Sequence, residues 1–471
     1  MFKDIPCGDT LPLDNVHAVS VSIPKFKDII DYGEGKSTQI TRGYPRFVLH
    51  PYLKKMAIFL QEKYALKQSK EVVIVSSQKF AKLICKKYDI KSDMHFEEEF
   101  GIVVVEKNSS NLQNILSFIQ HIGCNLSSRY AEDFLYKNAL IDSLHVEELE
   151  DEKSALQTIL STLSSAYNQP KENISLTPSG MNAIYAILKG LQEIRSERDT
   201  IVQLGWLYLD CMNVVKNHSK NSKVFYDIKN LTKLEEFLKT DGYRVAALIT
   251  EVPTNPLLQS VDLEHLKSLC DKYDIALVID ATFATPYNLD LKPYADVMVE
   301  SLTKFACGNA DVLMGCFVLN EDSKYCVEDF KPYADEPYIK DIKRLAFEIK
   351  SYRSRIKKII KNARELVEYF KTKSFIDKIY SCDFSGVISV TFTKPFERVY
   401  DSLNFFKGPS LGAEFTLLMP YVYLAHYDLI TSKEGRELLK DNGIPIELIR
   451  ISAGMEDIET IKEEFNKLDY I

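Results

Sequence analysis

The sequence predicts an α/β protein whose large domain holds a mostly parallel sheet, followed by a smaller α+β domain. Two observations predict this fold. Short apolar strands alternate with helical patterns through the centre of the chain, which is typical of parallel sheets. The pattern then changes near residue 331, where a long charged helix and further strands follow. A chain of 471 residues is long enough for about two to three such domains.

The central strands place two reactive side chains at one edge of the sheet. The predicted strands cover residues 245–250, 276–280, 297–300 and 312–319. Asp262 is expected to cap the helix that follows the first of them. Asp280 ends one strand and Lys304 follows the next. Ligands bind beyond the carboxyl ends of such strands, so we expect a site there.

We divide the chain into four parts. They are an N-terminal arm (1–60), an inserted α/β module (61–125), the large domain (126–330) and the small domain (331–471). In the module, the pattern predicts strands at 71–75 and 101–105 and helices at 77–88 and 111–122. In the small domain, it predicts one long helix over 343–371 and a strand at 387–391.

Composition excludes several classes of function. The net charge is −8 and the basic residues are scattered among acids, so we expect no nucleic-acid partner. The nine cysteines lack metal-ligand spacing, which predicts no metal site and reduced thiols in a cytoplasmic protein. The N-terminus lacks the apolar core of a signal peptide. No apolar run approaches the about 18 residues of a membrane-spanning helix, so we expect no membrane partner.

The segment Ser301-Leu302-Thr303-Lys304 carries the strongest chemical signal. A lysine after one strand and Asp280 at the end of another is the layout of a pyridoxal phosphate (PLP) site. Lys304 would form the imine, and the hydroxyls of Ser301 and Thr303 would face the phosphate. Asp280 would keep the pyridine nitrogen protonated, so that the ring accepts carbanion electrons. The alternative is a surface lysine in a Ser/Thr turn, since short motifs also match by chance.

Three further segments fit this chemistry. Ser179-Gly180-Met181 precedes an apolar helix, whose N-terminus would hold a phosphate; the alternative is an ordinary helix start capped by Ser179. Asn255, in the rigid turn of residues 251–256, would donate to the phenolic oxygen of the cofactor or simply cap the turn. Arg450 lies in an apolar strand and needs an anion, either a substrate carboxylate or a structural acid.

Together these segments resemble the Cys/Met-metabolism PLP enzymes, which include cystathionine γ-synthase, the cystathionine lyases and methionine γ-lyase. The matching motifs occur in order at 179–181, 251–256, 280–286, 301–304 and 450–457. The resemblance covers roughly residues 30–60 and 125–471 and is greatest to the longer fungal-type cystathionine γ-synthases. It implies PLP fold type I, like that of aspartate aminotransferase, with pyridoxal 5'-phosphate as cofactor and small amino acids as substrates.

The resemblance also assigns roles outside these motifs. Ser410 lies in a loop that resembles the one holding the substrate carboxylate. Tyr44 and Arg46 match a pair that reaches the phosphate of the neighbouring subunit. This implies a homo-oligomer, either a dimer or a tetramer of close dimers. The alternative is that Arg46 pairs with an acid in its own chain.

Two segments depart from the family pattern near the substrate mouth. Tyr208-Leu209-Asp210-Cys211 replaces Tyr-Gly-Gly-Thr, and residues 308–311 read Gly-Asn-Ala-Asp instead of Gly-His-Ser-Asp. Tyr208 is the best candidate to stack on the pyridine ring, and Trp206 is the second.

The resemblance predicts γ-replacement, in which an O-acyl-homoserine and cysteine give cystathionine in trans-sulfuration and methionine biosynthesis. Lys304 would move protons at Cα and Cβ, and Arg450 would fix the α-carboxylate. If Arg450 is structural, Arg129 is the next candidate anchor. Alternative activities are those of a carbon–sulfur lyase acting on cystathionine or methionine and an O-acylhomoserine sulfhydrylase. The non-enzyme alternative is a catalytically decayed family member.

Overall fold

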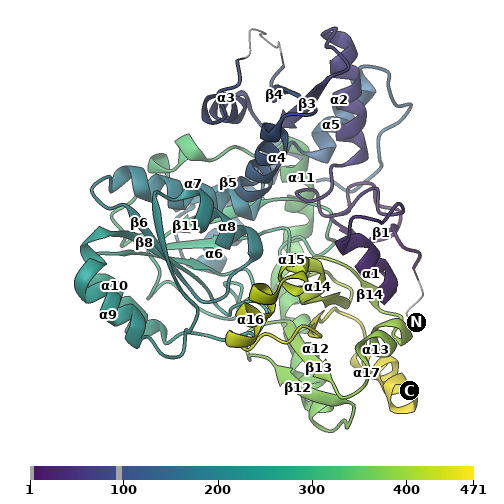
Figure 1. The fold of residues 1–471 in the computed structure, drawn as a ribbon, viewed down its shortest axis with the longest axis vertical. Helices are drawn as coiled ribbons and strands as arrows, with labels where there is room; N and C mark the ends of the chain where they lie inside the picture. Colours follow the sequence, from purple (N-terminus) through teal and green to yellow (C-terminus); the bar gives the residue numbers. More distant parts are fainter. Residues whose placement is uncertain (1–4, 92–97) are drawn as a thin grey trace.

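The computed structural model describes residues 5–91 and 98–471 (Figure 1). Residues 1–4 and 92–97, in the predicted arm and module, lie outside the described residues.

The large domain is built on a seven-stranded sheet in the order β5-β11-β10-β9-β8-β6-β7. Strand β11 is antiparallel to its neighbours, and the other strands are parallel to one another. The strands are β5 (Ile174–Thr177), β6 (Thr200–Leu204), β7 (Asn221–Phe225), β8 (Val245–Glu251), β9 (Ala276–Asp280), β10 (Val297–Glu300) and β11 (Gly315–Leu319). The predicted mostly parallel sheet is confirmed.

Helices cover both faces of this sheet. The central strands are apolar along their length, and alternate residues pack into two separate cores, as expected for a sheet buried on both sides. One face packs against α6 (Glu152–Tyr167), α9 (Thr232–Asp241) and α10 (Leu263–Lys272). The other packs against α7 (Gly180–Ile194) and α8 (Leu209–His218). Asp262 caps α10 as predicted, by accepting a hydrogen bond of 3.0 Å from the His265 backbone N–H.

The inserted module contains the predicted strand pair and helices. Its antiparallel strands are β3 (Lys70–Val75) and β4 (Gly101–Glu106), and its helices are α3 (Gln78–Lys87) and α4 (Ser110–Ile122). The flanking helices α2 (Pro51–Lys63) and α5 (Ser128–Lys137) pack on the other side of the strand pair. Figure 1 shows the module above the large domain, with α4 next to α7 and α8.

The predicted arm is not extended throughout. It contains β1 (Thr10–Leu11), β2 (Ser20–Val21), α1 (Phe26–Gly33) and most of α2. The segment runs along both domains of its own chain. The Val19 N–H donates to the Ala310 carbonyl at 2.8 Å, and the Ile23 N–H donates to the Lys407 carbonyl at 2.8 Å.

The small domain holds a five-stranded sheet in the order β12-β13-β16-β15-β14. These strands are β12 (Ile376–Tyr380), β13 (Val387–Phe392), β14 (Phe406–Lys407), β15 (Leu417–Pro420) and β16 (Ile449–Ser452). The surrounding helices are α13 (Phe396–Ser402), α14 (Tyr421–Ala425), α15 (Tyr427–Thr431), α16 (Lys433–Asp441) and α17 (Ile458–Asn466). The strand predicted at 387–391 is β13, and β16 carries Arg450.

The single helix predicted over 343–371 is wrong. The structure has α11 (Ile339–Glu348), a 3₁₀ turn (Ile349–Ser351) and α12 (Tyr352–Lys371). Arg355 explains the break, since its Nη2 donates to the Glu348 carbonyl at 3.0 Å and to Ser351 Oγ at 2.7 Å. The side chain thereby replaces a backbone donor at the junction.

Three findings bear on the excluded functions. Among the helices in the described part of the chain, none has the length and apolarity needed to cross a membrane. The nine cysteines are free thiols. Within residues 5–91 and 98–471, there is no group of three or more His, Cys, Asp or Glu side chains arranged to hold a metal ion.

Candidate active site

Lys304 follows β10 and reaches into a cavity between the large domain, the small domain and the N-terminal segment. Its Nζ lies 2.9 Å from Ser410 Oγ and 3.4 Å from the Tyr44 hydroxyl. The ring centroid of Tyr44 is 4.5 Å from the same nitrogen. Burial in the cavity lowers the pKa of the Lys304 amine, because desolvation disfavours the charged form. The lowered pKa favours the uncharged, nucleophilic form of the amine.

The small-domain loop that contains Gly412 packs closely against the backbone of Lys304. Gly412 has a φ of 82°, and a Cβ at this position would lie 2.9 Å from the Lys304 carbonyl carbon and 2.7 Å from the Phe305 nitrogen. A side chain at residue 412 would therefore push the loop away from the lysine.

Three acids end neighbouring strands beside the lysine. In the sheet, Asp280 is in register with Glu251 on one side and Val299 on the other. Asp280 lines the cavity, and its Oδ1 accepts a hydrogen bond of 2.9 Å from the Thr282 N–H. Burial raises the pKa of Asp280 and raises that of Glu251 well above its usual range. These carboxyl groups can therefore hold protons within the cavity.

Glu300 lies at the end of β10, on the strand next to Asp280. Its two carboxyl oxygens accept hydrogen bonds of 2.6 Å from the hydroxyls of Tyr167 and Tyr352. Burial raises its pKa to about 7, even though both tyrosines favour the ionised form. Sequence reasoning did not identify Glu300 as an ionisable group of interest, because its two tyrosine partners are distant in the chain.

Groups that could donate to a phosphate line the same cavity. Gly180 and Met181, in the first turn of α7, line it together with Ser301 and Arg46. The first backbone N–H groups of a helix have no partner within the helix and favour anions. A Cβ on Gly180 would lie 2.8 Å from the Cβ of Ser301, so glycine permits this close approach. These groups can hold a phosphate.

Two residues predicted at the phosphate do not line the cavity. Ser179 caps α7 by accepting from the Asn182 N–H at 3.1 Å, and its hydroxyl donates to the Gly123 carbonyl at 2.9 Å. Thr303 Oγ1 exchanges hydrogen bonds with the backbone of Met314. Their hydroxyls are thus engaged in backbone contacts here, and their role at the phosphate stays a prediction.

Arg46 reaches the cavity of its own chain. Its Nη1 donates to Asp210 Oδ2 at 2.5 Å, and its Nη2 donates to the Tyr208 hydroxyl at 2.6 Å. Burial opposes its charge, but Tyr208 and Asp210 outweigh this effect and raise the pKa of Arg46. Within this chain, Arg46 thus pairs with an acid, as the alternative interpretation has it, and its contact with a neighbouring subunit stays a prediction.

Arg450 lies at the small-domain side of the cavity and is 5% exposed. Its guanidinium donates to Asn255 Oδ1 at 3.2 Å, to the Ser410 carbonyl at 2.8 Å and to Met419 Sδ at 3.0 Å. Burial lowers its pKa to about 10. Among the described residues, no carboxylate forms an ion pair with it. A buried arginine held by neutral groups is suited to bind an incoming carboxylate.

The second candidates for the carboxylate anchor and for ring stacking, Arg129 and Trp206, lie outside the cavity lining. Arg129 does not line the cavity, and its guanidinium is taken by Glu147 at 2.6 and 2.7 Å and by Asp341 at 3.0 Å. Trp206 packs behind the cavity, with its Nε1 3.4 Å from His426 Nε2. Tyr208 lines the cavity, so it stays the candidate for stacking.

Comparison with known proteins identifies the family. The model of the Cys/Met metabolism PLP-dependent enzymes matches residues 151–468. The L-2-amino-4-chloropent-4-enoate dechlorinase/desaturase of Streptantibioticus cattleyicolor is 33% identical over 481 residues, covering 96% of each chain. This chain belongs to the Cys/Met metabolism PLP-dependent enzyme family. The cystathionine gamma-synthase of Neurospora crassa is 30% identical over 330 residues, covering 64% of this chain and 52% of that one.

Solved structures confirm the fold of this family member. The cystathionine gamma-synthase of Xanthomonas oryzae, in complex with aminoacrylate and cysteine, has a TM-score of 0.57 at 19% identity and covers 66% of this chain and 84% of its own. The cystathionine gamma-lyase of yeast has a TM-score of 0.57 at 19% identity and covers 70% and 93%. The predicted PLP fold type I and the predicted cofactor, pyridoxal phosphate, are confirmed.

The cavity has the donor set that this cofactor requires. An amine with a lowered pKa, Lys304, and a carboxyl group, Asp280, line it. The first turn of α7 with Ser301 and Arg46 would hold the phosphate, and Arg450 lies at the other side. Asp210 and Gln120 complete the contacts of Arg46. In the sequence, Asp210 could have been assigned to the site only because it is an acid where the family pattern has glycine. Nothing in the sequence pattern points to Gln120.

Proposed function

We propose that this PLP-dependent enzyme removes a leaving group from the γ-carbon of an amino acid. The observation that carries the proposal is that Lys304, Asp280 and Arg450 face one cavity. When bound, pyridoxal phosphate supplies an electron sink for negative charge on the carbon next to the substrate nitrogen. Within the cavity, Lys304 would take the proton from Cα and, once that proton has been passed on to the bound cofactor, a second proton from Cβ; the γ-substituent would then leave with its bonding electrons.

Each side chain supports one part of this chemistry. The lowered pKa of Lys304 favours the free amine that a general base needs. Asp280, at the end of β9, lines the cavity, and its carboxylate would keep a proton on the ring nitrogen by pairing with the positive charge there. Arg450 would bind the α-carboxylate with two parallel hydrogen bonds, and so orient the Cα–H bond toward Lys304.

The charges around the cavity favour elimination over replacement by cysteine. Among the described residues, the charged side chains that line it are Arg46, Glu251, Asp280, Lys304 and Arg450. Arg46 is paired with Asp210, and Arg450 is assigned to the substrate carboxylate. No further cationic side chain is left for the carboxylate of a second amino acid, whose burial without a partner would be costly. We therefore propose γ-elimination from an amino acid with a small, mostly apolar γ-substituent.

The similarity to the dechlorinase/desaturase supports elimination, because the two chains match over 96% of their lengths. γ-Replacement of an O-acyl-homoserine by cysteine, as predicted from the sequence, is the second candidate, favoured by the similarity to the fungal cystathionine gamma-synthase. Carbon–sulfur lyase and sulfhydrylase activities use the same residues with a different leaving group or acceptor. The location in the cytoplasm, consistent with nine free thiols, and a homo-oligomeric assembly remain predictions.

Product analysis separates these reactions. The PLP-loaded protein is incubated with 2-amino-4-chloropent-4-enoate, methionine, cystathionine and O-acetyl- and O-succinyl-homoserine, each with and without cysteine or sulfide. We expect release of the γ-substituent without any thiol, with an unsaturated amino acid or a keto acid as product. Formation of cystathionine only when cysteine is present would instead establish the second candidate. No turnover of any substrate, despite bound PLP, would count against both.

A further inference from the structure

We propose that Arg355 is a positioning residue, which fixes the loop of residues 305–311 after Lys304 (the lysine loop) and joins it to the small-domain loop of residues 410–414. This inference rests on the proposed PLP site. Arg355 lies near the start of α12 and is 1% exposed. It does not line the cavity, so any effect on the chemistry passes through the residues that it contacts.

The first contacts of Arg355 are with the backbone that directly follows the lysine. Its Nη1 donates to the carbonyls of Phe305 at 3.0 Å and Ala306 at 3.1 Å. Gly308, with a φ of 70°, passes so close that a Cβ there would overlap the guanidinium. Hydrogen bonds from a charged donor are stronger than those between neutral groups. The guanidinium therefore restrains the chain within two residues of Lys304.

The second contacts are with the break between α11 and α12. Nη2 of Arg355 donates to the Glu348 carbonyl and to Ser351 Oγ, and these bonds interrupt the helix. Helix α11 packs against α6 of the large domain, whereas α12 packs against β12, β13 and α17 of the small domain. The break is thus the point where the chain passes from one domain to the other. Arg355 joins this crossing to the lysine loop.

The third contact is with the small-domain loop. The Nε of Arg355 donates to Glu414 Oε1 at 2.8 Å. The same loop places Gly412 against the backbone of Lys304 and Ser410 against its amine. One side chain therefore sets how the lysine and the loop that packs on it lie relative to each other.

The contacts of Arg355 use the whole guanidinium. A guanidinium has five N–H groups, and those of Arg355 have five acceptors on these three segments. A lysine in its place would carry three donors on a single nitrogen, which cannot reach all three segments at once. The position therefore needs the geometry of a guanidinium and not only its positive charge.

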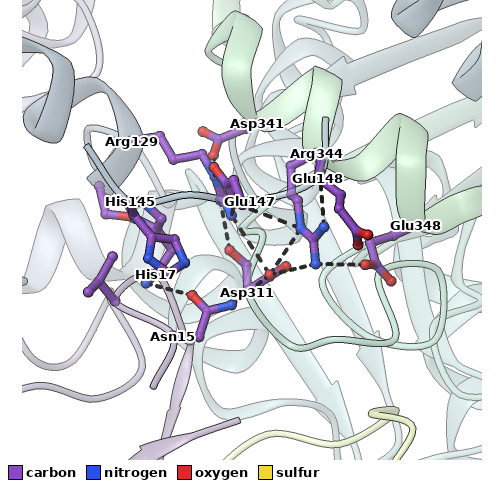
Figure 2. Close-up of polar contacts among 12 residues, drawn as sticks. Asn15, His17, Arg129, His145, Glu147, Glu148, Asp311, Asp341, Arg344 and Glu348 are labelled. Carbon is purple, nitrogen blue, oxygen red and sulfur yellow. Dashed lines mark hydrogen bonds and ion pairs between the residues drawn. The ribbon is translucent and has the colours of Figure 1, made fainter. Parts of the chain in front are cut away.

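A neighbouring arginine holds the far end of the lysine loop. Figure 2 shows Arg344 of α11 reaching Asp311 on one side and Glu348 on the other. Its Nε donates to Asp311 Oδ2 at 3.0 Å, and its Nη2 lies 2.7 Å from Glu348 Oε1. The lysine loop thus stays attached at Asp311 when Arg355 is changed. A substitution of Arg355 should loosen the backbone next to Lys304 without releasing the whole loop.

The rate of PLP attachment tests this role without relying on turnover. Apo protein is mixed with saturating PLP, and the first-order attachment to Lys304 is followed by absorbance. Arg355→Lys should slow this step about 10-fold or more, because a displaced amine reaches the aldehyde of PLP less often. Arg353→Lys, at an exposed arginine of the same helix, is the matched control and should keep the wild-type rate.

Glu414→Gln is the second variant, since the Glu414 side chain is 46% exposed and folding should tolerate the change. It removes the ion pair and leaves the guanidinium in place, so attachment should slow less than in Arg355→Lys. The double variant should be hardly slower than Arg355→Lys alone, because both changes act through one contact.

Rates are expressed per folded chain, as judged by circular dichroism. Equal rates in the wild type and both variants would overturn the positioning role, even if the variants unfold at a lower temperature, and would leave the proposed function standing. If Arg355→Lys does not fold, a wild-type rate in Glu414→Gln overturns the role and a slower rate supports it. No attachment in the wild type would overturn both this inference and the PLP site on which the proposed function rests.

Discussion

The amine of Lys304 lies 2.9 Å from the hydroxyl of Ser410, a residue 106 positions later in the chain and in the other domain. Ser410 adopts a φ of 88°, which is costly for a residue with a side chain. Its carbonyl also accepts from Arg450 at 2.8 Å. One strained residue thus links the proposed base to the proposed carboxylate anchor, so the contact between the domains sets the distance between them.

Lys304→Ala should abolish covalent PLP attachment and turnover. The variant removes the one amine that lies beside Ser410 and Tyr44 in the cavity. Absorbance of the PLP-saturated protein checks attachment, and the product assay checks turnover. Retention of wild-type activity by the purified variant would show that Lys304 is not the base.

Asp280→Asn should keep PLP bound and lose most of kcat. The amide oxygen can still accept from the Thr282 N–H, so the strand end stays in place. An amide cannot hold a ring nitrogen in its protonated form, so the electron sink weakens. Asp322→Asn, at an exposed aspartate, is the control. An unchanged kcat in the folded, PLP-loaded Asp280 variant would contradict this role.

Arg450→Lys should raise KM for the amino-acid substrate strongly and change PLP affinity little. An ammonium cannot make the two parallel hydrogen bonds that a carboxylate receives from a guanidinium. Loss of such a pair costs on the order of 2–5 kcal/mol, of which the lysine should recover part. Arg436→Lys, at an exposed arginine, serves as the comparison. A KM within error of the wild type would make Arg450 structural.

Glu300 should make the stability of the protein depend on pH. Its folded pKa of about 7 is above the usual value of 4.5, so its favourable contribution is full below pH 4.5 and is lost as pH rises through 7. The loss amounts to about 3 kcal/mol. Unfolding of wild type and Glu300→Gln is compared from pH 4.5 to 8, and the wild type should lose this much relative to the variant. A constant difference across the range would show that Glu300 keeps its ordinary pKa.

Much of the site could be predicted from the sequence because its chemistry lies at strand ends. β9 and β10 are short apolar runs, and parallel strands bring their carboxyl ends together, so Asp280 and Lys304 had to meet. Arg450 was predicted because a charge within an apolar strand needs an anion. These inferences depend on local pattern and sheet geometry.

The other features of the fold and the site depend on contacts between side chains and backbone that the local sequence pattern does not predict. Thr303 follows the family motif, yet its hydroxyl bonds the backbone of Met314, which depends on how the next loop folds back. The break before α12 arises from Arg355, whose side chain reaches the backbone of an earlier turn. The hydrogen bonds among Arg46, Asp210 and Gln120 join three distant segments, so no single stretch of sequence predicts them.

We expect Lys304 to carry the cofactor of a catalytic site in this cavity. Borohydride reduction of the PLP-loaded protein, followed by proteolysis and mass spectrometry of the peptides, tests it most directly. We expect a stoichiometric pyridoxyl modification on the peptide that contains Lys304, and none on this peptide when substrate is added before reduction. Modification of a different lysine, or no stable modification in a PLP-saturated protein, would show that Lys304 does not carry the cofactor.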